Sequence, residues 1–87
     1  MTDGKYRVRK QRKDAALGSN DILVEIGNEI RTIRLSEGMT QEELALVTGV
    51  GRDLIIQIEK GSPGVAIGKI LYVLTSLGKR IALIDRH

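Results

Sequence analysis

The sequence predicts a small all-α domain of four to five helices with one short β-strand near its end. Apolar residues recur every three or four positions in several stretches, which is the spacing of one face of a helix. Glycines follow directly after these stretches, where helices commonly end. A last apolar stretch, residues 81–84, is too short for a helix and is rich in β-prone residues. The chain of 87 residues has room for one such domain.

The basic character of the chain is concentrated in its first residues. Residues 1–19 contain six Lys or Arg and two Asp, a net charge of +4, so the rest of the chain sums to −1 within a total of +3. Dense like charge without apolar periodicity predicts a flexible basic arm over residues 1–19. We expect the folded domain to cover residues 20–78, and a strand and tail to cover residues 79–87.

Composition argues against several classes of protein. The chain has no cysteine, so disulfides, thiolate metal sites and thiol catalysis are excluded, and a reducing compartment such as the cytoplasm is expected. Its apolar runs are short and broken by charge, and the basic N-terminus lacks the apolar core of a secretory signal, so we expect no membrane segment. His87 is the only histidine, and Glu42 and Glu43 point to different sides of a helix. We therefore expect no enzyme activity, no metal site and no cofactor.

The first predicted helix covers residues 21–37. Ser19 or Asn20 can cap its start, and Gly38 is placed to end it. Its apolar face consists of isoleucines that recur at intervals of four, four and three residues, namely Ile22, Ile26, Ile30 and Ile33.

The second predicted helix begins after Thr40. Thr40 and Glu43 have the spacing of a capping box, in which the threonine hydroxyl accepts from the Glu43 N–H and the glutamate reaches back. Gly49 is placed to end this helix. Its inward-facing residues are predicted to be Leu44, Ala45 and Val47.

The third predicted helix covers residues 52–60, and only Gly49-Val50-Gly51 separates it from the second. Two helices joined by so short a glycine-containing turn are typical of the helix-turn-helix motif. Because its inner side is pinned to a shared core, the outer side of this helix is free to enter a major groove of DNA. The inner side is predicted to consist of Ile55, Ile58 and Glu59.

The fourth predicted helix starts at Ser62-Pro63, because proline is tolerated in the first turn of a helix. Gly78 is placed to end it. Val65, Tyr72 and Val73 extend its apolar surface, so this helix is expected to be buried on two sides. Its main apolar face is formed by Ile67, Ile70, Leu71, Leu74 and Leu77.

The strand predicted at residues 81–84 has no second strand to pair with in this chain, and the backbone groups of a lone strand need partners. The simplest partner is the same strand of a second copy, related by a two-fold axis. A strand-like tail packed on its own domain is the alternative. We expect a dimer interface formed by Tyr72, Val73, Ile81 and Leu83.

A group of residues within 26–63 forms a more specific pattern than helical periodicity alone: Ile26-Gly27, Ile30, Arg34, Gly38, Thr40 to Ala45, Gly49-Val50, Ile55, Ile58-Glu59 and Lys60-Gly61. This stretch resembles the XRE/Cro-type helix-turn-helix family, and the resemblance implies a compact, lambda-repressor-like fold. Residues 62–83 are similar to HipB-type antitoxins, in which the fourth helix is followed by a short strand that pairs with that of the dimer mate.

The resemblance implies that residues at the start of the second helix and along the third contact DNA. Gln41, Lys60 and Ser62 would hold phosphates. Arg52 would contact a guanine edge or a phosphate, and Gln57 suits adenine. The full set implied for DNA contact is Thr40, Gln41, Arg52, Asp53, Ile56, Gln57, Lys60 and Ser62.

Three residues of the third predicted helix leave alternatives open. Asp53 can accept from cytosine or simply cap the helix. Leu54 and Ile56 stand where polar residues are common in the family, so they are either half-buried, in contact with thymine methyl groups, or adapted to a protein surface. The resemblance also implies a half-buried ion pair between Arg34 and Glu59 that links the first helix to the third.

The implied function is that of a homodimeric transcriptional repressor that reads a palindromic DNA operator. By resemblance it would be the antitoxin of a HipBA-like module, with a HipA-like kinase toxin as its partner. It would regulate its own operon, and it would lie in the cytoplasm, associated with the nucleoid. One alternative is a protein-interaction module that neutralises a toxin or bridges to the transcription machinery. Others are a phage-type repressor and a restriction-modification controller.

The predicted basic arm over residues 1–19 leaves two interpretations open. It is either a tether to DNA or a disordered leader that stays in solvent.

Overall fold

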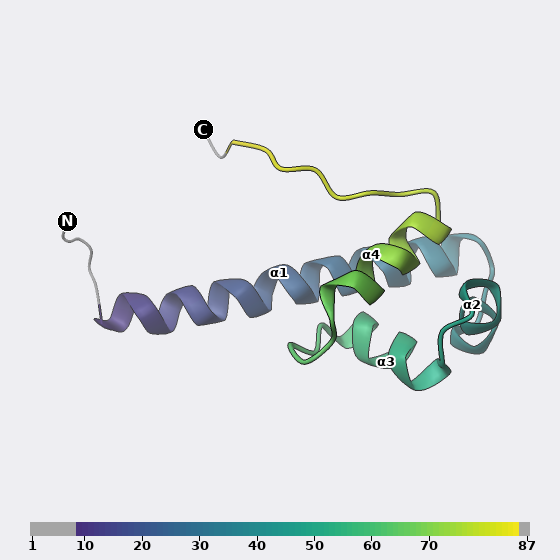
Figure 1. Cartoon of the computed structure of the whole chain (residues 1–87), viewed down its shortest axis with the longest axis horizontal. Helices are drawn as coiled ribbons and strands as arrows, with labels where there is room; N and C mark the ends of the chain where they lie inside the picture. Colours follow the sequence, from purple (N-terminus) through teal and green to yellow (C-terminus); the bar gives the residue numbers. More distant parts are fainter. Residues whose placement is uncertain (1–8, 86–87) are drawn as a thin grey trace.

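The computed structural model describes the backbone of residues 9–85 and the side chains of residues 21–85, and this part of the chain contains four helices. They are α1 (Arg9–Ser36), α2 (Gln41–Thr48), α3 (Arg52–Lys60) and α4 (Ile67–Ser76). The C-terminal half of α1 packs against the three shorter helices, while its N-terminal half extends away from them (Figure 1). The predicted all-α architecture is therefore confirmed for the described residues.

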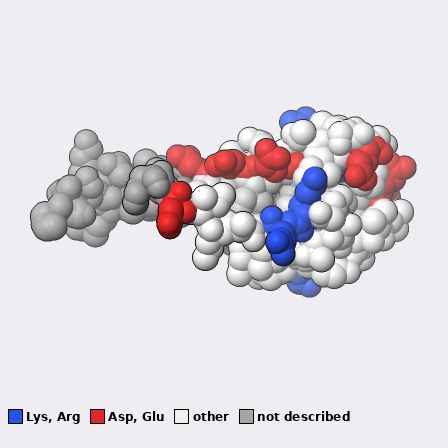
Figure 2. All heavy atoms as spheres, turned by 90° about the horizontal axis from the view of Figure 1, so that it is seen from above, with Lys and Arg blue, Asp and Glu red and all other residues white. Residues whose placement is uncertain are grey.

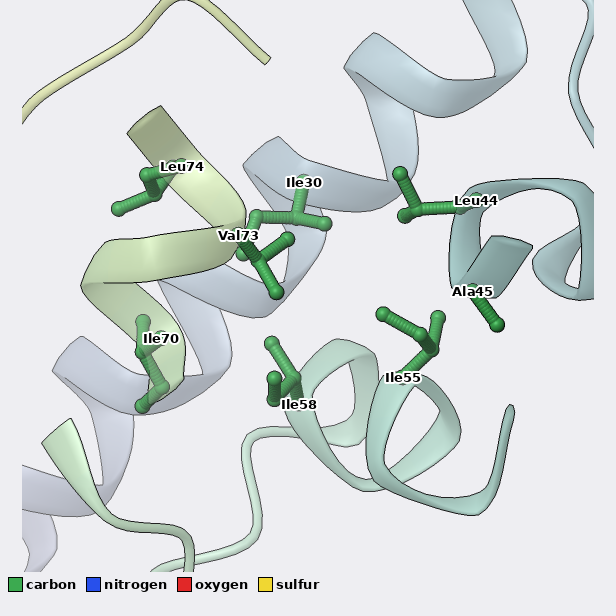
Figure 3. Packing of buried hydrophobic residues seen from close by; sticks show 8 residues of the cluster. All are labelled: Ile30, Leu44, Ala45, Ile55, Ile58, Ile70, Val73 and Leu74. Atoms are coloured by element: carbon green, nitrogen blue, oxygen red, sulfur yellow. The ribbon is translucent and has the colours of Figure 1, made fainter. Parts of the chain in front are cut away.

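One apolar core joins all four helices. Its members point toward one another between α1, α2, α3 and α4 (Figure 3), and they are Ile30, Leu44, Ala45, Ile55, Ile58, Ile70, Val73 and Leu74. Fully burying one aliphatic side chain stabilises a fold by about 1.5–3 kcal/mol. The cluster thus fixes how α3 is held against the rest of the molecule.

α1 and α3 touch through their backbones at Gly27. A Cβ atom built on Gly27 would overlap the carbonyl oxygen of Ile58 and would lie 2.6 Å from that of Glu59. No side chain fits at this point, so glycine is what allows the two helices to approach this closely. The contact holds the C-terminal end of α3 against the middle of α1.

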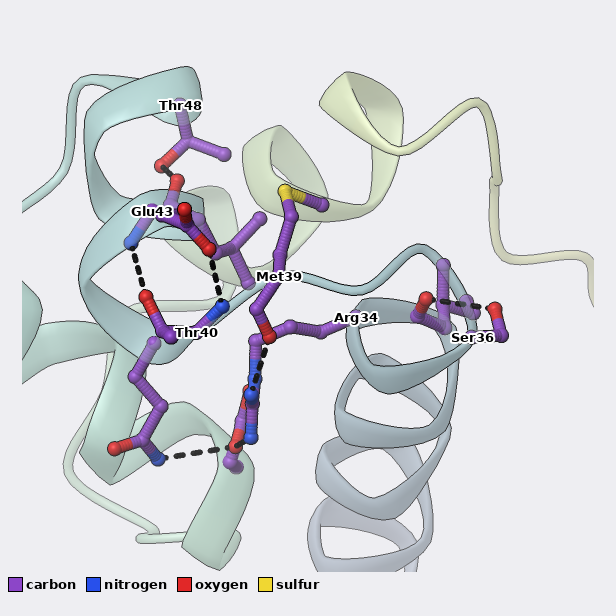
Figure 4. Close-up of polar contacts among 10 residues, drawn as sticks. Arg34, Ser36, Met39, Thr40, Glu43 and Thr48 are labelled. Carbon is purple, nitrogen blue, oxygen red and sulfur yellow. Dashed lines mark hydrogen bonds and ion pairs between the residues drawn. The ribbon is translucent and has the colours of Figure 1, made fainter.

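The start of α2 and the turn after it follow the sequence prediction. Thr40 Oγ1 accepts a hydrogen bond from the Glu43 N–H at 3.0 Å, and Glu43 Oε1 accepts one from the Thr40 N–H at 2.8 Å (Figure 4). Gly49 has a φ of +77°, and its N–H donates to the Ala45 carbonyl at 2.8 Å. That left-handed conformation favours glycine, and it turns the chain so that α3 begins at Arg52.

α1 is longer than predicted. It begins at Arg9, so the predicted start near residue 21 is wrong and the backbone of residues 9–19 is helical rather than part of a flexible arm. This stretch is rich in Arg, Lys, Gln and Ala, which are good helix formers, and contains no proline, so the helix continues without an apolar face. Residues 1–8 of the predicted arm lie outside the described residues.

α4 is shorter than predicted at its start. It begins at Ile67 after the N-cap Ala66, so the start predicted at Ser62-Pro63 is wrong. α3 ends in a left-handed Gly61, with a φ of +78°. Residues 63–65 then form a turn and bend before α4, in which Val65 packs against the core.

Two valines have environments that the sequence pattern did not predict. Val47, expected to face inward, is 64 % exposed, whereas Thr48 is buried. Leu44, Ala45 and Thr48 define the inner face of α2, and Val47 lies about 100° around the helix from the centre of that face. Val73, expected at a dimer interface, has no exposed surface because it is part of the core, so that prediction is wrong.

The segment after α4 has no assigned strand among the described residues. It leaves α4 and runs back in the direction of the N-terminal half of α1 (Figure 1). Leu83 is 100 % exposed and Ile84 83 %. The strand predicted at residues 81–84 is not confirmed, because within the described residues no second strand forms backbone hydrogen bonds with this segment. None of the helices among the described residues combines the length and the apolar composition that a membrane span requires.

Candidate DNA-binding surface

α3 has one buried side and one exposed side, as the sequence predicts. Ile55, Ile58 and Glu59 are buried against the other helices. The exposed side consists of Arg52, Asp53, Gln57 and Lys60, which recur at intervals that place them along one surface of the helix. A helix held on one side and polar on the other can be laid into a major groove of DNA.

Leu54 and Ile56 are both half-buried, which confirms the first of the three alternatives drawn from the sequence. Leu54 packs against the edge of the core. Ile56 lies at the other edge of α3, where it lines a hollow between α1, α2 and α3 together with Gln41 and Lys60. The exposed part of Ile56 therefore borders the polar surface.

An ion pair between α1 and α3 holds the C-terminal end of α3 in place. Arg34 Nε donates to Glu59 Oε2 at 2.7 Å and Nη2 donates to Glu59 Oε1 at 3.1 Å, with both side chains buried. Arg34 Nη1 also donates to the Met39 carbonyl at 2.8 Å (Figure 4). The hydrogen bond and charge of Glu59 raise the pKa of Arg34 against the opposing effect of burial. The ion pair predicted by resemblance is confirmed, and it is bidentate.

Gln41 at the start of α2 takes part in the same network. Its Nε2 donates to Glu59 Oε1 at 3.1 Å, so the amide is held beside α3 rather than extended into solvent. A glutamine amide carries two N–H donors, and the second can still donate to a phosphate. The sequence did not predict the Gln41–Glu59 contact, since nothing in the spacing of residues 18 positions apart indicates it.

The remaining predicted contact residues are also placed by the structure. The Thr40 hydroxyl accepts the capping hydrogen bond and keeps its own hydrogen for donation. Gly51, the N-cap of α3, provides no side-chain cap, and among residues 21–85 Asp53 makes no capping hydrogen bond either. Asp53 instead lies in the first turn of α3, where the helix dipole favours a carboxylate. The Ser62 N–H donates to the Gln57 carbonyl at 3.0 Å just beyond α3.

Sequence reasoning missed two residues of this surface, Asn28 and Arg31. Both are exposed on α1 and line the hollow that also contains Gln41, Ile56 and Lys60. The available signal was their spacing, because Asn28 and Arg31 lie six and three residues before Arg34. No cluster of three or more His, Asp or Glu side chains suited to a metal ion occurs among the described residues.

Comparison with known proteins agrees with this geometry. The model of the helix-turn-helix family (HTH_3) matches residues 30–71, from the C-terminal part of α1 into α4. A protein of Sinorhizobium fredii (strain NBRC 101917 / NGR234), described as the uncharacterized HTH-type transcriptional regulator y4mF, is 42 % identical over 60 residues, which cover 69 % of this chain and 79 % of that protein. The chain therefore belongs to the XRE-type helix-turn-helix family.

Proposed function

We propose that this chain is a sequence-specific transcriptional repressor that binds a palindromic DNA operator as a homodimer. The observation that carries the proposal is the exposed surface of α3, where Arg52, Gln57 and Lys60 project away from a core that holds Ile55 and Ile58. Arginine and glutamine are the residues best suited to read guanine and adenine in the major groove. The similarity to a protein described as an HTH-type transcriptional regulator supports a role in transcription regulation.

Exposed apolar residues support the homodimer. Tyr72 of α4 is 54 % exposed, and in the tail Ile81 is 43 % and Leu83 100 % exposed. A second copy that pairs its tail with this one would cover these side chains and satisfy the backbone groups of residues 81–84. Two copies of α3 would then have to lie about 34 Å apart to enter successive major grooves on one side of the duplex.

We further propose that the repressor is the antitoxin of a HipBA-like module with a HipA-like kinase toxin as its partner. The support is the resemblance of residues 62–83 to HipB-type antitoxins. Such a protein represses its own operon, so the operator is expected upstream of its own gene. A phage-type repressor or a restriction-modification controller would use the same surface at a different operon. None of these functions requires catalysis, and we propose no enzyme activity.

Footprinting on the region upstream of the gene tests the repressor proposal. We expect one protected inverted repeat, with protection that weakens steeply as salt is raised because phosphate contacts release counterions. The absence of salt-dependent binding to that region would contradict the proposal. Pull-downs with the full chain test the antitoxin role. Recovery of a kinase-like protein encoded by a neighbouring gene would support that role, and its absence would contradict the antitoxin role but not the repressor function.

A second candidate function is a protein-interaction module that neutralises a toxin or bridges to the transcription machinery. Two exposed apolar residues of α2 favour it, since Leu46 is 78 % and Val47 64 % exposed. Substituting Leu46→Ser distinguishes the two functions. Loss of partner binding with unchanged DNA binding would favour the interaction module. Gln57→Ala, in contrast, should weaken operator recognition only if α3 reads DNA.

A further inference from the structure

We propose that Asn28 and Arg31 of α1 form an additional contact to the DNA phosphate backbone, beside the C-terminal end of α3. The inference rests on the proposed DNA-binding function and adds a surface on α1 to it. Both side chains are exposed, and their three-residue spacing places them next to each other on one helical face. They line one hollow together with Gln41 and Lys60, the residues expected to hold phosphates.

The close approach of α1 and α3 explains why α1 reaches this surface. Gly27 touches the backbone carbonyls of Ile58 and Glu59, so the next residue of α1, Asn28, lies directly beside the end of α3. Arg31 follows one helical turn later. Any duplex that contacts Lys60 at the end of α3 and Gln41 at the start of α2 therefore passes in front of these two side chains.

The hollow has a net positive charge. Its single carboxylate, Glu59, is compensated by the bidentate pair with Arg34 and also accepts from Gln41. Arg31 and Lys60 remain as two cations, and no ion pair to either is found within residues 21–85. The amides of Asn28 and Gln41 add neutral donors. Two cations with amide donors around a solvent-open hollow suit the oxygens of a phosphodiester.

Two acidic residues of α1, Glu25 and Glu29, face a different side of the helix from Arg31. Glu25 and Glu29 line a separate hollow, which they share with Lys79 and Arg80 of the segment after α4. Figure 2, which views the molecule from that side, shows acidic side chains in a row along α1. Glu25 and Glu29 lie about 120° and 160° around α1 from Arg31, and neither forms an ion pair with it within residues 21–85, so they leave Arg31 available to DNA.

The test compares two variants that each remove one positive charge, Arg31→Gln and Arg80→Gln. Arg80 is exposed beside the acidic side of α1 and provides the matched control. A fluorescent duplex about three helical turns long carries the upstream inverted repeat, and a second carries the same bases scrambled. Binding to the full chain is measured by anisotropy between about 50 and 200 mM salt.

We expect Arg31→Gln to reduce the slope of log K against log salt by about 0.9 for each bound protomer, and to lower the affinity for both duplexes by the same factor. Arg31→Lys should restore the slope, and Arg80→Gln should leave it unchanged. Equal slopes for Arg31→Gln and the wild type would overturn this contact but not the DNA-binding function. Equal losses of affinity in Arg31→Gln and Arg80→Gln would have the same consequence. A wild-type chain that binds neither duplex would refute the proposed function itself.

Discussion

At the scale of single residues, Glu59 connects stability to DNA binding. Its carboxylate is buried, pairs with Arg34 through two hydrogen bonds and holds the amide of Gln41. The same side chain therefore fixes α3 to α1 and orients a residue expected to contact a phosphate. The sequence predicted the Arg34–Glu59 pair through family resemblance, but the contact with Gln41 depends on how α2 packs against α3 and has no local signature.

Replacing Glu59 by alanine should destabilise the fold by about 3 kcal/mol, because Arg34 would keep a buried charge without its partner. Thermal unfolding monitored by circular dichroism measures the effect. Glu42→Ala is the control, since Glu42 is an exposed residue of α2. A melting temperature that matches the wild type for Glu59→Ala would show that the ion pair contributes nothing to stability.

Replacing Gln57 by alanine should impair sequence recognition without affecting the fold. Gln57 is exposed, and one bidentate contact to adenine discriminates against a wrong base by about 1–3 kcal/mol. Affinities for the operator and for a scrambled duplex should therefore become more similar, while the melting temperature stays the same. If discrimination between the two duplexes survives the substitution, Gln57 does not read a base.

At the scale of elements, the helices with strong local end signals were predicted best. The capping box at Thr40 and the glycines at positions 49 and 61 give α2 and α3 their observed bounds. The starts of α1 and α4 were predicted incorrectly. Residues 9–19 lack an apolar face yet form helix, and Ser62-Pro63 resembles a helix start but belongs to the connection between α3 and α4.

The crossing of α1 and α3 provides a test at this scale. Gly27→Ala should destabilise the fold by more than about 1 kcal/mol, because its Cβ has no space against the carbonyls of Ile58 and Glu59. Gly68→Ala is the matched control in α4, where a Cβ meets nothing within 4 Å. That control should leave stability nearly unchanged, because Gly68 is the second residue of α4 and not part of the helix interior. Chemical denaturation measures both, and equal effects of the two substitutions would contradict the close backbone contact.

At the scale of the whole molecule, the arrangement of the four helices gives the DNA-binding surface its shape. The outward face of α3 could be predicted because the spacing of Ile55 and Ile58 fixes which side is buried. The hollow that adds Asn28 and Arg31 could not, because it forms only where α1 crosses α3. The burial of Val73 was missed for a similar reason, since α4 is apolar on more than one side and only packing decides which side enters the core.

The dimer belongs to this scale as well. Leu83→Asp places a charge at a fully exposed apolar position that the proposed dimer would bury, so it should convert dimers to monomers and weaken operator binding together. Analytical ultracentrifugation and operator affinity measure the two effects. Ile67→Asp, at an exposed apolar position in the first turn of α4, is the control and should change neither effect. A dimer that persists in Leu83→Asp would exclude the tail from the interface.

The central claim is that the exposed side of α3 is the surface that reads DNA. Titration of the isotope-labelled protein with a duplex of its own upstream region, followed by amide NMR, tests this claim most directly. We expect the largest shifts at Arg52, Gln57 and Lys60, with further shifts at Gln41. Shifts confined to α4 and the segment after it, with α3 unchanged, would contradict the account.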